Sequence, residues 1–318
     1  PHGRAAAPPR HGAAPRAHVP ARSFSLDGTM ELTKQFVKAK NPCTGGYRWF
    51  IRDHNGHGDY QAILDALVAD GRIDDACWLL DQFGPVDTVL RLDTVDAHAI
   101  VFAGTLEVRS GITVDTLVRA GRHLCTGGGI RAGTAIVAGS DIEAAGNLAS
   151  GGHIRAGGDV SAGWGIEAAT QLDAGGHCRA KWDIQAGGDI VAGLMLQADG
   201  GIQAGHALRS GRGIKAGADI VAGHDLVAVQ GILAGGNVTA GNHIESAWGI
   251  KALGDILAQG AIRAGEGVEA GGEIGCGAGY GIYAGLQVRR DAWADSARIQ
   301  ARQRPDGLIS GHWADSAS

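Results

Sequence analysis

Histidine is the side chain in this sequence best suited to act as a metal ligand or a general base, and the 318-residue chain contains 13 of them. His206 and His224 are 18 residues apart, so their side chains would lie beside each other in a chain whose structure repeats every 18 residues. A metal site would need a third ligand at the same separation, but positions 188 and 242 hold Gly and Asn. We interpret the two histidines as solvated turn residues and predict no metal site.

Other arrangements that carry chemistry are missing from the sequence. It has no Gly-x-Ser-x-Gly elbow, no His-Glu-x-x-His and no phosphate-binding Lys-Ser/Thr motif. The segment His54-Asn-Gly-His57-Gly-Asp59 is polar, but Asp59 in the role of an N-cap explains it equally well. The five cysteines, which are widely spaced and form no CxxC pair, predict reduced thiols: Cys43, Cys77, Cys125, Cys178 and Cys276. We therefore expect a protein that is not an enzyme and has no catalytic, cofactor-binding or metal-binding residues.

The composition narrows the fold class. Glycine is abundant, with 54 residues, whereas aromatic residues make up 5% of the chain, so a conventional globular core is not expected. Collagen is excluded because glycine does not recur at every third residue and the chain has only 8 prolines. The net charge of −5 argues against a nucleic-acid partner. With neither a long apolar run nor a secretory signal, we expect a cytoplasmic protein without a membrane partner.

A repeat of six residues runs through most of the chain. From Ile100 to Ile274, every sixth position is aliphatic except Cys178, which makes 29 aliphatic residues among 30 positions. Two residues further on, 21 of the 24 positions from Ala132 to Ala270 are Ala, and 16 of these 24 are followed by Gly. The repeating unit, or hexad, is therefore Ile-x-Ala-Gly-x-x.

This unit is too short for a helix and fits one short strand followed by one corner. The aliphatic residue and the Ala lie two positions apart, so they share the inner face of a strand, and the residue between them points outward. We expect the glycine to adopt positive φ at the corner. Three hexads per coil predict a mainly β protein, a parallel β-solenoid or three-faced β-helix of ten coils, with a small α-rich N-terminal module and a C-terminal cap.

The repeat resembles those of the bactofilin-like, polymer-forming cytoskeletal proteins in units such as Gly188-Asp-Ile-Val-Ala-Gly193 and Gly236-Asn-Val-Thr-Ala-Gly241. The resemblance covers residues 130–274 and implies a right-handed, three-faced β-helix that self-assembles. Hexapeptide acyltransferases also have hexad solenoids, but their small residue precedes the aliphatic one, whereas here it follows. The long repeat and the flanking modules depart from a bactofilin core.

The flanking segments differ in composition from the repeat. Residues 1–29 lack periodicity, and we expect a disordered tail, with Met30 as an alternative natural start. Residues 30–92 contain two stretches of helical spacing around Asp70-Gly71-Arg72, which predict a helical hairpin that caps the solenoid. The solenoid is assigned to residues 93–279 and a C-terminal cap to residues 280–318.

Two groups of outward residues are candidate contact surfaces. Trp164 and Trp182 occupy equivalent corner positions three hexads apart, and Trp248 occupies the same slot of a later hexad, so these rings are candidates for stacking on a partner. Outward positions are otherwise mostly charged or polar, but Val221, Val227 and Leu233 occupy three successive outward positions. Val229 also replaces a corner Gly, so adjoining faces of about one coil become apolar together and predict an interface.

These features favour a structural or scaffold protein that forms a homo-oligomer or polymer. Two other functions remain open. One is an acyltransferase-type trimer, although the hexads contain no inserted loop that carries a histidine. The other is a surface or phage-associated binding protein that uses the solenoid as a stalk.

Overall fold

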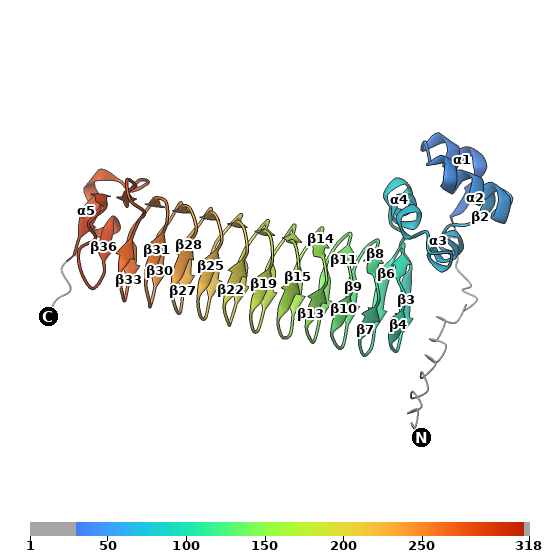
Figure 1. The fold of residues 1–318 in the computed structure, drawn as a ribbon, viewed down its shortest axis with the longest axis horizontal. Helices are drawn as coiled ribbons and strands as arrows, with labels where there is room; N and C mark the ends of the chain where they lie inside the picture. The colour runs from blue at the N-terminus through green and yellow to red at the C-terminus, as the bar shows by residue number, and fades with distance from the viewer. Residues whose placement is uncertain (1–29, 315–318) are drawn as a thin grey trace, which may run out of the picture.

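The computed structural model describes residues 30–314 and shows a straight rod with a group of helices at its N-terminal end (Figure 1). The rod is a parallel β-solenoid of three sheets, which contain 11, 12 and 13 strands and make about 12 turns. The predicted mainly β solenoid with a small helical N-terminal region is confirmed. The expected ten coils are too few, because strands before Ile100 and after Ile274 also join the sheets. The disordered tail predicted for residues 1–29 lies outside the described residues.

From β3 to β36, every third strand along the chain joins the same sheet, and the last two strands, β37 and β38, join the sheets of β35 and β36. The 13-stranded sheet consists of β3 (Val89–Leu92), β6 (Thr105–Val108), β9 (Leu124–Thr126), β12 (Ile142–Ala144), β15 (Val160–Ala162), β18 (Cys178–Ala180), β21 (Leu196–Ala198), β24 (Ile214–Ala216), β27 (Ile232–Ala234), β30 (Ile250–Ala252), β33 (Val268–Ala270), β36 (Arg298–Gln300) and β38 (His312–Trp313). The 11-stranded sheet consists of β4 (Val95–Ala97), β7 (Ile112–Val114), β10 (Ile130–Ala132), β13 (Leu148–Ser150), β16 (Ile166–Ala168), β19 (Ile184–Ala186), β22 (Ile202–Ala204), β25 (Ile220–Ala222), β28 (Val238–Ala240), β31 (Ile256–Ala258) and β34 (Ile274–Gly275). The 12-stranded sheet consists of β5 (Ile100–Phe102), β8 (Leu117–Ala120), β11 (Ala135–Ala138), β14 (His153–Ala156), β17 (Leu172–Ala174), β20 (Ile190–Ala192), β23 (Leu208–Ser210), β26 (Leu226–Ala228), β29 (Ile244–Ser246), β32 (Ile262–Ala264), β35 (Ile282–Tyr283) and β37 (Leu308–Ser310).

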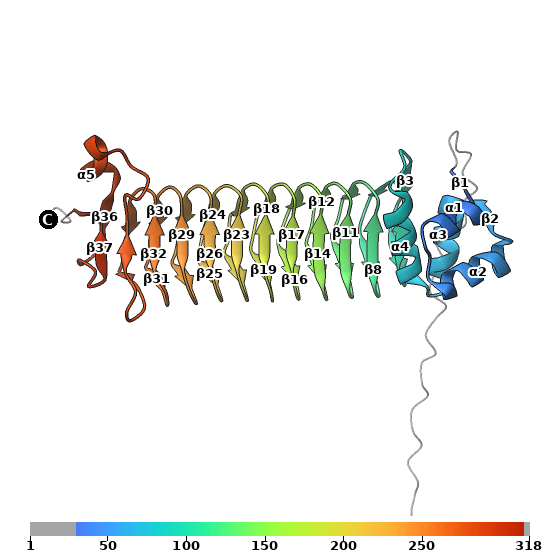
Figure 2. The ribbon, with the colours of Figure 1, turned by 90° about the horizontal axis from the view of Figure 1, so that it is seen from above.

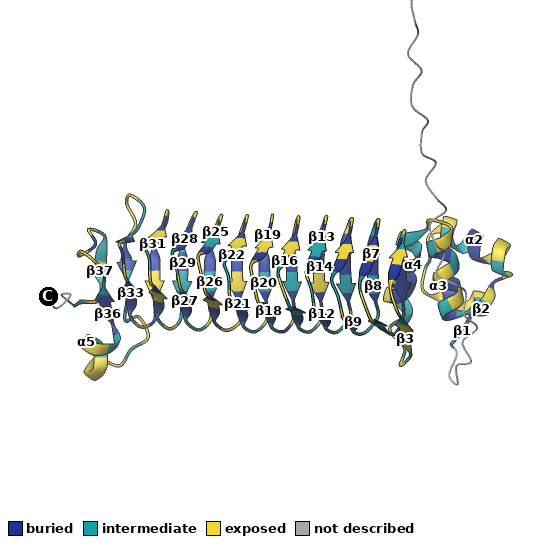
Figure 3. Ribbon diagram, turned by 90° about the horizontal axis from the view of Figure 1, so that it is seen from below, coloured by how far each residue is buried: buried dark blue, intermediate teal, exposed yellow. Residues whose placement is uncertain are grey.

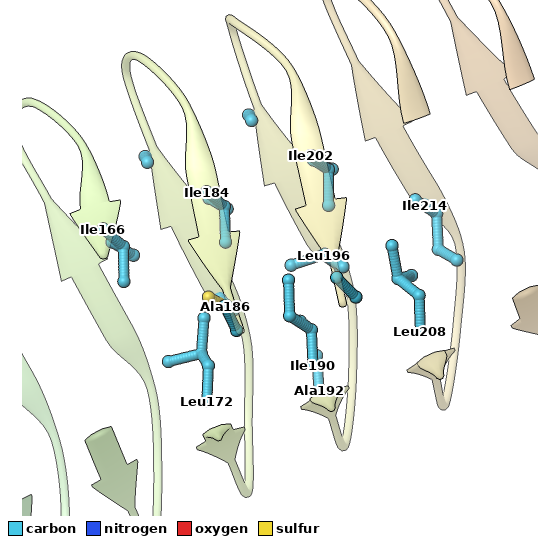
Figure 4. Close-up of a cluster of buried hydrophobic side chains, with 14 of the residues drawn as sticks. Ile166, Leu172, Ile184, Ala186, Ile190, Ala192, Leu196, Ile202, Leu208 and Ile214 are labelled. Atoms are coloured by element: carbon cyan, nitrogen blue, oxygen red, sulfur yellow. The ribbon is translucent and has the colours of Figure 1, made fainter. Parts of the chain in front are cut away.

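The core is a column of aliphatic side chains inside the three sheets (Figure 4). Strands pair in register with the strand three hexads away, so Ile184 lies beside Ile202 and Ala186 beside Ala204. From β10 to β33, the aliphatic residue of each hexad and the Ala or Ser two positions later are buried, whereas the residue between them is exposed or partly exposed, as the alternation in Figure 3 shows. The side-chain period of two in a strand thus separates the core from the outer wall.

The repeat glycines are needed for a different reason from the one expected. Within the described residues, the glycines with positive φ are Gly56, Gly71, Gly84, Gly279, Gly285 and Gly311, all outside the regular hexads. The expectation of positive φ at the corners is therefore wrong. A Cβ built on Gly193 would overlap the carbonyl oxygen of Gly175 in the preceding coil. The corner glycines allow successive backbones to stack this closely.

Corner carboxylates and amides hold neighbouring coils together. The Oδ1 atom of Asp189 accepts a hydrogen bond from the backbone N–H of Ala207 at 2.9 Å, and Asp183 accepts one from Gly201 at 2.7 Å. The same bond recurs through Asp219, Asn237 and Asp255. Each side chain satisfies a backbone donor that lies three hexads further along the chain.

The helical module is larger than the predicted hairpin. The hairpin itself is confirmed as α3 (Tyr60–Ala69) and α4 (Ile73–Phe83), and Asp59 caps α3 by accepting from the N–H of Ala62 at 3.0 Å. Two further helices, α1 (Lys34–Ala39) and α2 (Thr44–His54), and the antiparallel pair β1 (Glu31–Thr33) and β2 (His57–Asp59) complete it. Its core includes Trp49 and Phe50, whereas Phe36 is 58% exposed. None of the helices in residues 30–314 has the length and apolar composition required to cross a bilayer.

The C-terminal segment continues the solenoid with irregular spacing. β35 pairs with β32, and β36 pairs with β33, so the segment after Tyr280 adds strands to two of the sheets. The short helices η1 (Arg290–Ala292) and α5 (Trp293–Ser296) lie in a connection between these strands. Trp313 packs against the end of the aliphatic column.

Candidate interaction surfaces

Trp164 and Trp182 form a stacked pair on the surface of the rod. Their ring centroids are 5.7 Å apart and their planes differ by 11°. The two side chains are 52% and 61% exposed. They follow β15 and β18, at the corner between the 13-stranded and 11-stranded sheets. The pair presents an exposed aromatic surface, and its use as a binding site stays a prediction.

Trp248 lies elsewhere on the rod. It follows β29, so it occupies the corner between the 12-stranded and 13-stranded sheets, although it has the same place within its hexad. It is 51% exposed. The three tryptophans therefore do not form one surface, because hexads align in space only at separations of whole coils.

The predicted aliphatic interface is divided among the three sheets. Val221 lies on β25 of the 11-stranded sheet, Val227 on β26 of the 12-stranded sheet and Leu233 on β27 of the 13-stranded sheet. Val229 lies at a corner and is 57% exposed. Successive outward positions face three directions, so these residues lie on adjoining walls around about one coil. Whether any of these residues contacts a partner stays a prediction.

His206 and His224 lie at one corner, as their spacing indicates. Their ring centroids are 5.5 Å apart, and the rings are nearly perpendicular. Asn242 follows in the next coil, where its Nδ2 atom donates to Asp225 at 2.8 Å. In residues 30–314, no group of three or more His, Cys, Asp or Glu side chains could hold a metal ion.

Gln61 links the helical module to the first strand of the 12-stranded sheet. Its Nε2 atom donates to the carbonyl oxygen of Val101 at 3.1 Å, and its Oε1 atom accepts from the N–H of Ala103 at 2.9 Å. The backbone carbonyl of Phe102 points to the opposite edge of β5, where it accepts a hydrogen bond from the N–H of Gly121 in the next coil. Gln61 therefore forms hydrogen bonds with the backbone groups on the edge of β5 that has no neighbouring strand. No sequence pattern indicates this role of Gln61, because its partners are distant in the chain.

The module covers both the end and part of one wall of the rod (Figure 2). α3 lies against β5, where Val101 is 1% exposed, and α4 places Asp81 in an ion pair with Arg119 of β8. Beyond α4, a groove of about 720 Å³ runs along the 12-stranded sheet and is lined by the ion pair of Arg155 and Asp173. The start of this sheet is thus the most covered of the three walls.

Burial raises the pKa of four of the cysteines, Cys77, Cys125, Cys178 and Cys276. Burial raises the pKa of Cys178 to about 12, because the thiolate would be enclosed in the aliphatic column. The pKa of Cys125 on β9 is raised by burial and then by the neighbouring carboxylates of Glu143 and Glu107. None of these four thiols has the lowered pKa of a nucleophile.

Comparison with known proteins places one part of the chain. Residues 30–83 match the family model described as the YdhT N-terminal domain, which corresponds to the helical module up to the end of α4. No curated protein matches the chain, and no solved structure matches it. The bactofilin-like resemblance of the repeat is not supported by any family match. The helical module is therefore similar to the YdhT N-terminal domain, and the solenoid is characterised by its structure alone.

Proposed function

We propose that this protein is a structural scaffold that self-associates through the walls of its solenoid and presents the helical module at one end. The observation that best supports this proposal is the uninterrupted register from Ile100 to Ile274, in which each strand pairs with the strand three hexads away. Every coil repeats the backbone hydrogen bonds of the previous one, so the rod is stiff and its outer surface consists of three long walls.

The capped end favours lateral over end-to-end assembly. Gln61 and α3 occupy the edge of β5, so a second solenoid would have to displace them in order to extend the 12-stranded sheet. The polymers implied by the bactofilin-like resemblance would therefore have to form from the walls or from the C-terminal end. The regular hexads also lack the inserted loop with a histidine that an acyltransferase-type site would require.

Sedimentation velocity of the full chain at rising concentration, together with electron microscopy, tests this proposal. We expect species larger than the 32.5-kDa monomer, with an elongated shape. A single monomer across the whole concentration range would contradict self-association. Turnover of an acyl-coenzyme A substrate would support the acyltransferase alternative instead.

A further inference from the structure

We propose that the 13-stranded sheet is the surface through which two copies of this chain associate, with their solenoid axes antiparallel. This inference rests on the self-association proposed above and specifies the face that carries it. The observations are the order of charges on this sheet, the small residue at the centre of that order, and the exposed tryptophan pair beside it.

The outward side chains of this sheet change sign along the rod. From β6 to β24, the seven strands present in turn Glu107, Cys125, Glu143, Ser161, Arg179, Gln197 and Lys215. Charged residues occupy alternate strands, so neighbouring charges are about 9.6 Å apart at the usual spacing between strands. Two acidic residues precede Ser161, and two basic residues follow it.

This order is complementary to itself when one copy is reversed. A two-fold axis that lies between the two sheets at Ser161, parallel to the strands and perpendicular to the rod, places Glu143 opposite Arg179 of the second copy, and Glu107 opposite Lys215. Each contact occurs twice, which gives four contacts between opposite charges. A parallel arrangement would instead set each charge against its own equivalent, and such contacts oppose binding.

The charges at the centre of this surface are available to a partner. Glu143, Arg179 and Lys215 are exposed, and within residues 30–314 none of the three takes part in an ion pair. Glu107 contacts Arg91 at 2.8 Å and is still 41% exposed. Ser161 is the smallest outward side chain of the seven, so two copies can approach closely at the axis.

The tryptophan pair lies at the border of the same region. Trp164 and Trp182 follow β15 and β18, the strand at the centre of the charge order and the next one along the rod. Their exposed rings extend the proposed contact area beyond the charged side chains. Exposed tryptophans are enriched among residues that contribute most to binding energy.

The other two walls fit a second copy less well. On the 12-stranded sheet, α4 covers the first strands, and charges further along form pairs within the wall, such as Arg263 with Glu245 at 2.5 Å. On the 11-stranded sheet, five successive outward residues from β19 onward carry no charge: Gln185, Gln203, Val221, Thr239 and Leu257. That half of the sheet therefore has no charge pattern to set the register of a partner.

The test exchanges the central charges. Glu143→Arg and Arg179→Glu each place like charges opposite one another in two contacts, and we expect each variant alone to self-associate at least about tenfold more weakly. In the proposed register, a heterodimer of the two variants again places unlike charges opposite one another. An equimolar mixture of the variants should therefore recover affinity. Glu167→Arg on β16 of the 11-stranded sheet is the matched control, and its self-association should equal that of the wild type. Sedimentation equilibrium measures all five samples, the wild type included.

The outcomes separate this inference from the proposed function. If the wild type self-associates and the two variants do so equally well, the proposed face is wrong and the scaffold proposal stands. The proposed register fails if the mixture of variants associates no better than either one alone. A control variant that weakens association as strongly as the other two also overturns the choice of face. If the wild type itself stays monomeric, the proposal of self-association fails, and this inference fails with it.

Discussion

The residues at the corners of the solenoid have their partners one coil away. Gly193 is required because a carbonyl of the preceding coil lies where its Cβ would be, and Asp189 binds a backbone N–H of the following coil. The buried serines follow the same rule, since the hydroxyl of Ser210 donates to the carbonyl of Leu194 at 2.6 Å. The residue type that a corner position requires is thus determined by its contacts with the neighbouring coil.

Ile190 and Val191 are adjacent in β20 but face opposite sides of the wall. Ile190 is 0% exposed, and Val191 is partly exposed. Ile190→Asp should lower the free energy of unfolding by about 4 kcal/mol or more, because the carboxylate would have no polar partner in the column. Val191→Asp should change it by about 0.5 kcal/mol or less. Equal losses of melting temperature in the two variants would contradict the assigned faces.

Gly193 and Gly231 differ in the space around them. Gly193→Ala should lower the free energy of unfolding by about 1–3 kcal/mol, because the two coils would have to separate to admit the methyl group. At Gly231, a Cβ would lie 3.3 Å from the carbonyl oxygen of Gly249, so Gly231→Ala should cost about 0.5 kcal/mol or less. Denaturant titration of both variants gives the comparison. The close stacking described above is disproved if Gly193→Ala is as stable as the wild type.

The ionisation of the Cys178 thiol makes the free energy of unfolding depend on pH in the alkaline range. Burial raises the pKa of its thiol from 9.0 to about 12, so between these values the unfolded chain loses a proton that the folded chain retains. Its contribution to the free energy of unfolding is therefore fully present below pH 9 and declines as the pH rises towards 12. Cys178→Val, which restores the residue class of the other core positions, should become progressively more stable relative to the wild type above pH 9. Parallel pH curves for the two proteins would contradict this assignment.

At the scale of elements, the ends of the rod differ from its middle. Interior strands have a neighbour on both sides, whereas β5 pairs with β8 alone, and its other edge is occupied by Gln61 and covered by α3. At the far end, Trp313 packs on the aliphatic column. Uncovered strand edges pair readily with other chains, so we interpret the helical module as a cap.

Removal of the module tests its role as a cap. A variant that lacks residues 1–88 keeps β3 but exposes the edge of β5 and the surface around Val101, so we expect aggregates or fibres. A variant that lacks only residues 1–29 is the control and should behave as the full chain does. Light scattering at increasing concentration distinguishes them. The module is not a cap if the shorter variant stays monodisperse.

At the scale of the whole molecule, the solenoid is a series of nearly equivalent coils. Each coil contacts mainly its two neighbours, as the regular pairing of strands three hexads apart shows. The loss of a complete coil from the middle should therefore leave a continuous core and three aligned walls.

Deletion of residues 194–211 removes one complete coil and joins Gly193 to Arg212, which occupies the same corner position as Leu194. We expect this variant to fold with a similar melting temperature and a rod shortened by about 4.8 Å. Deletion of residues 194–202 places aliphatic residues out of phase and should prevent cooperative folding. Circular dichroism and small-angle X-ray scattering report both properties. Similar behaviour of the two deletions would refute the coil register.

The hexad alone was enough to predict the solenoid. A period of six leaves room for one strand and one corner, and the alternation of side chains in a strand determines which residues face the core. The burial of Ile190 and the outward position of Val191 were predictable for this reason. The helix boundary at Asp59 was equally local, because an N-cap depends on backbone donors within one turn.

Only the tertiary structure decided which distant segments contact each other, because no short-range pattern in the sequence connects them. Gln61 reaches the edge of β5 because α3 packs there, and nothing in the sequence around Gln61 indicates that contact. The residues after Tyr280 lose the hexad and yet continue two of the sheets, because free strand edges accept any segment whose backbone can pair with them.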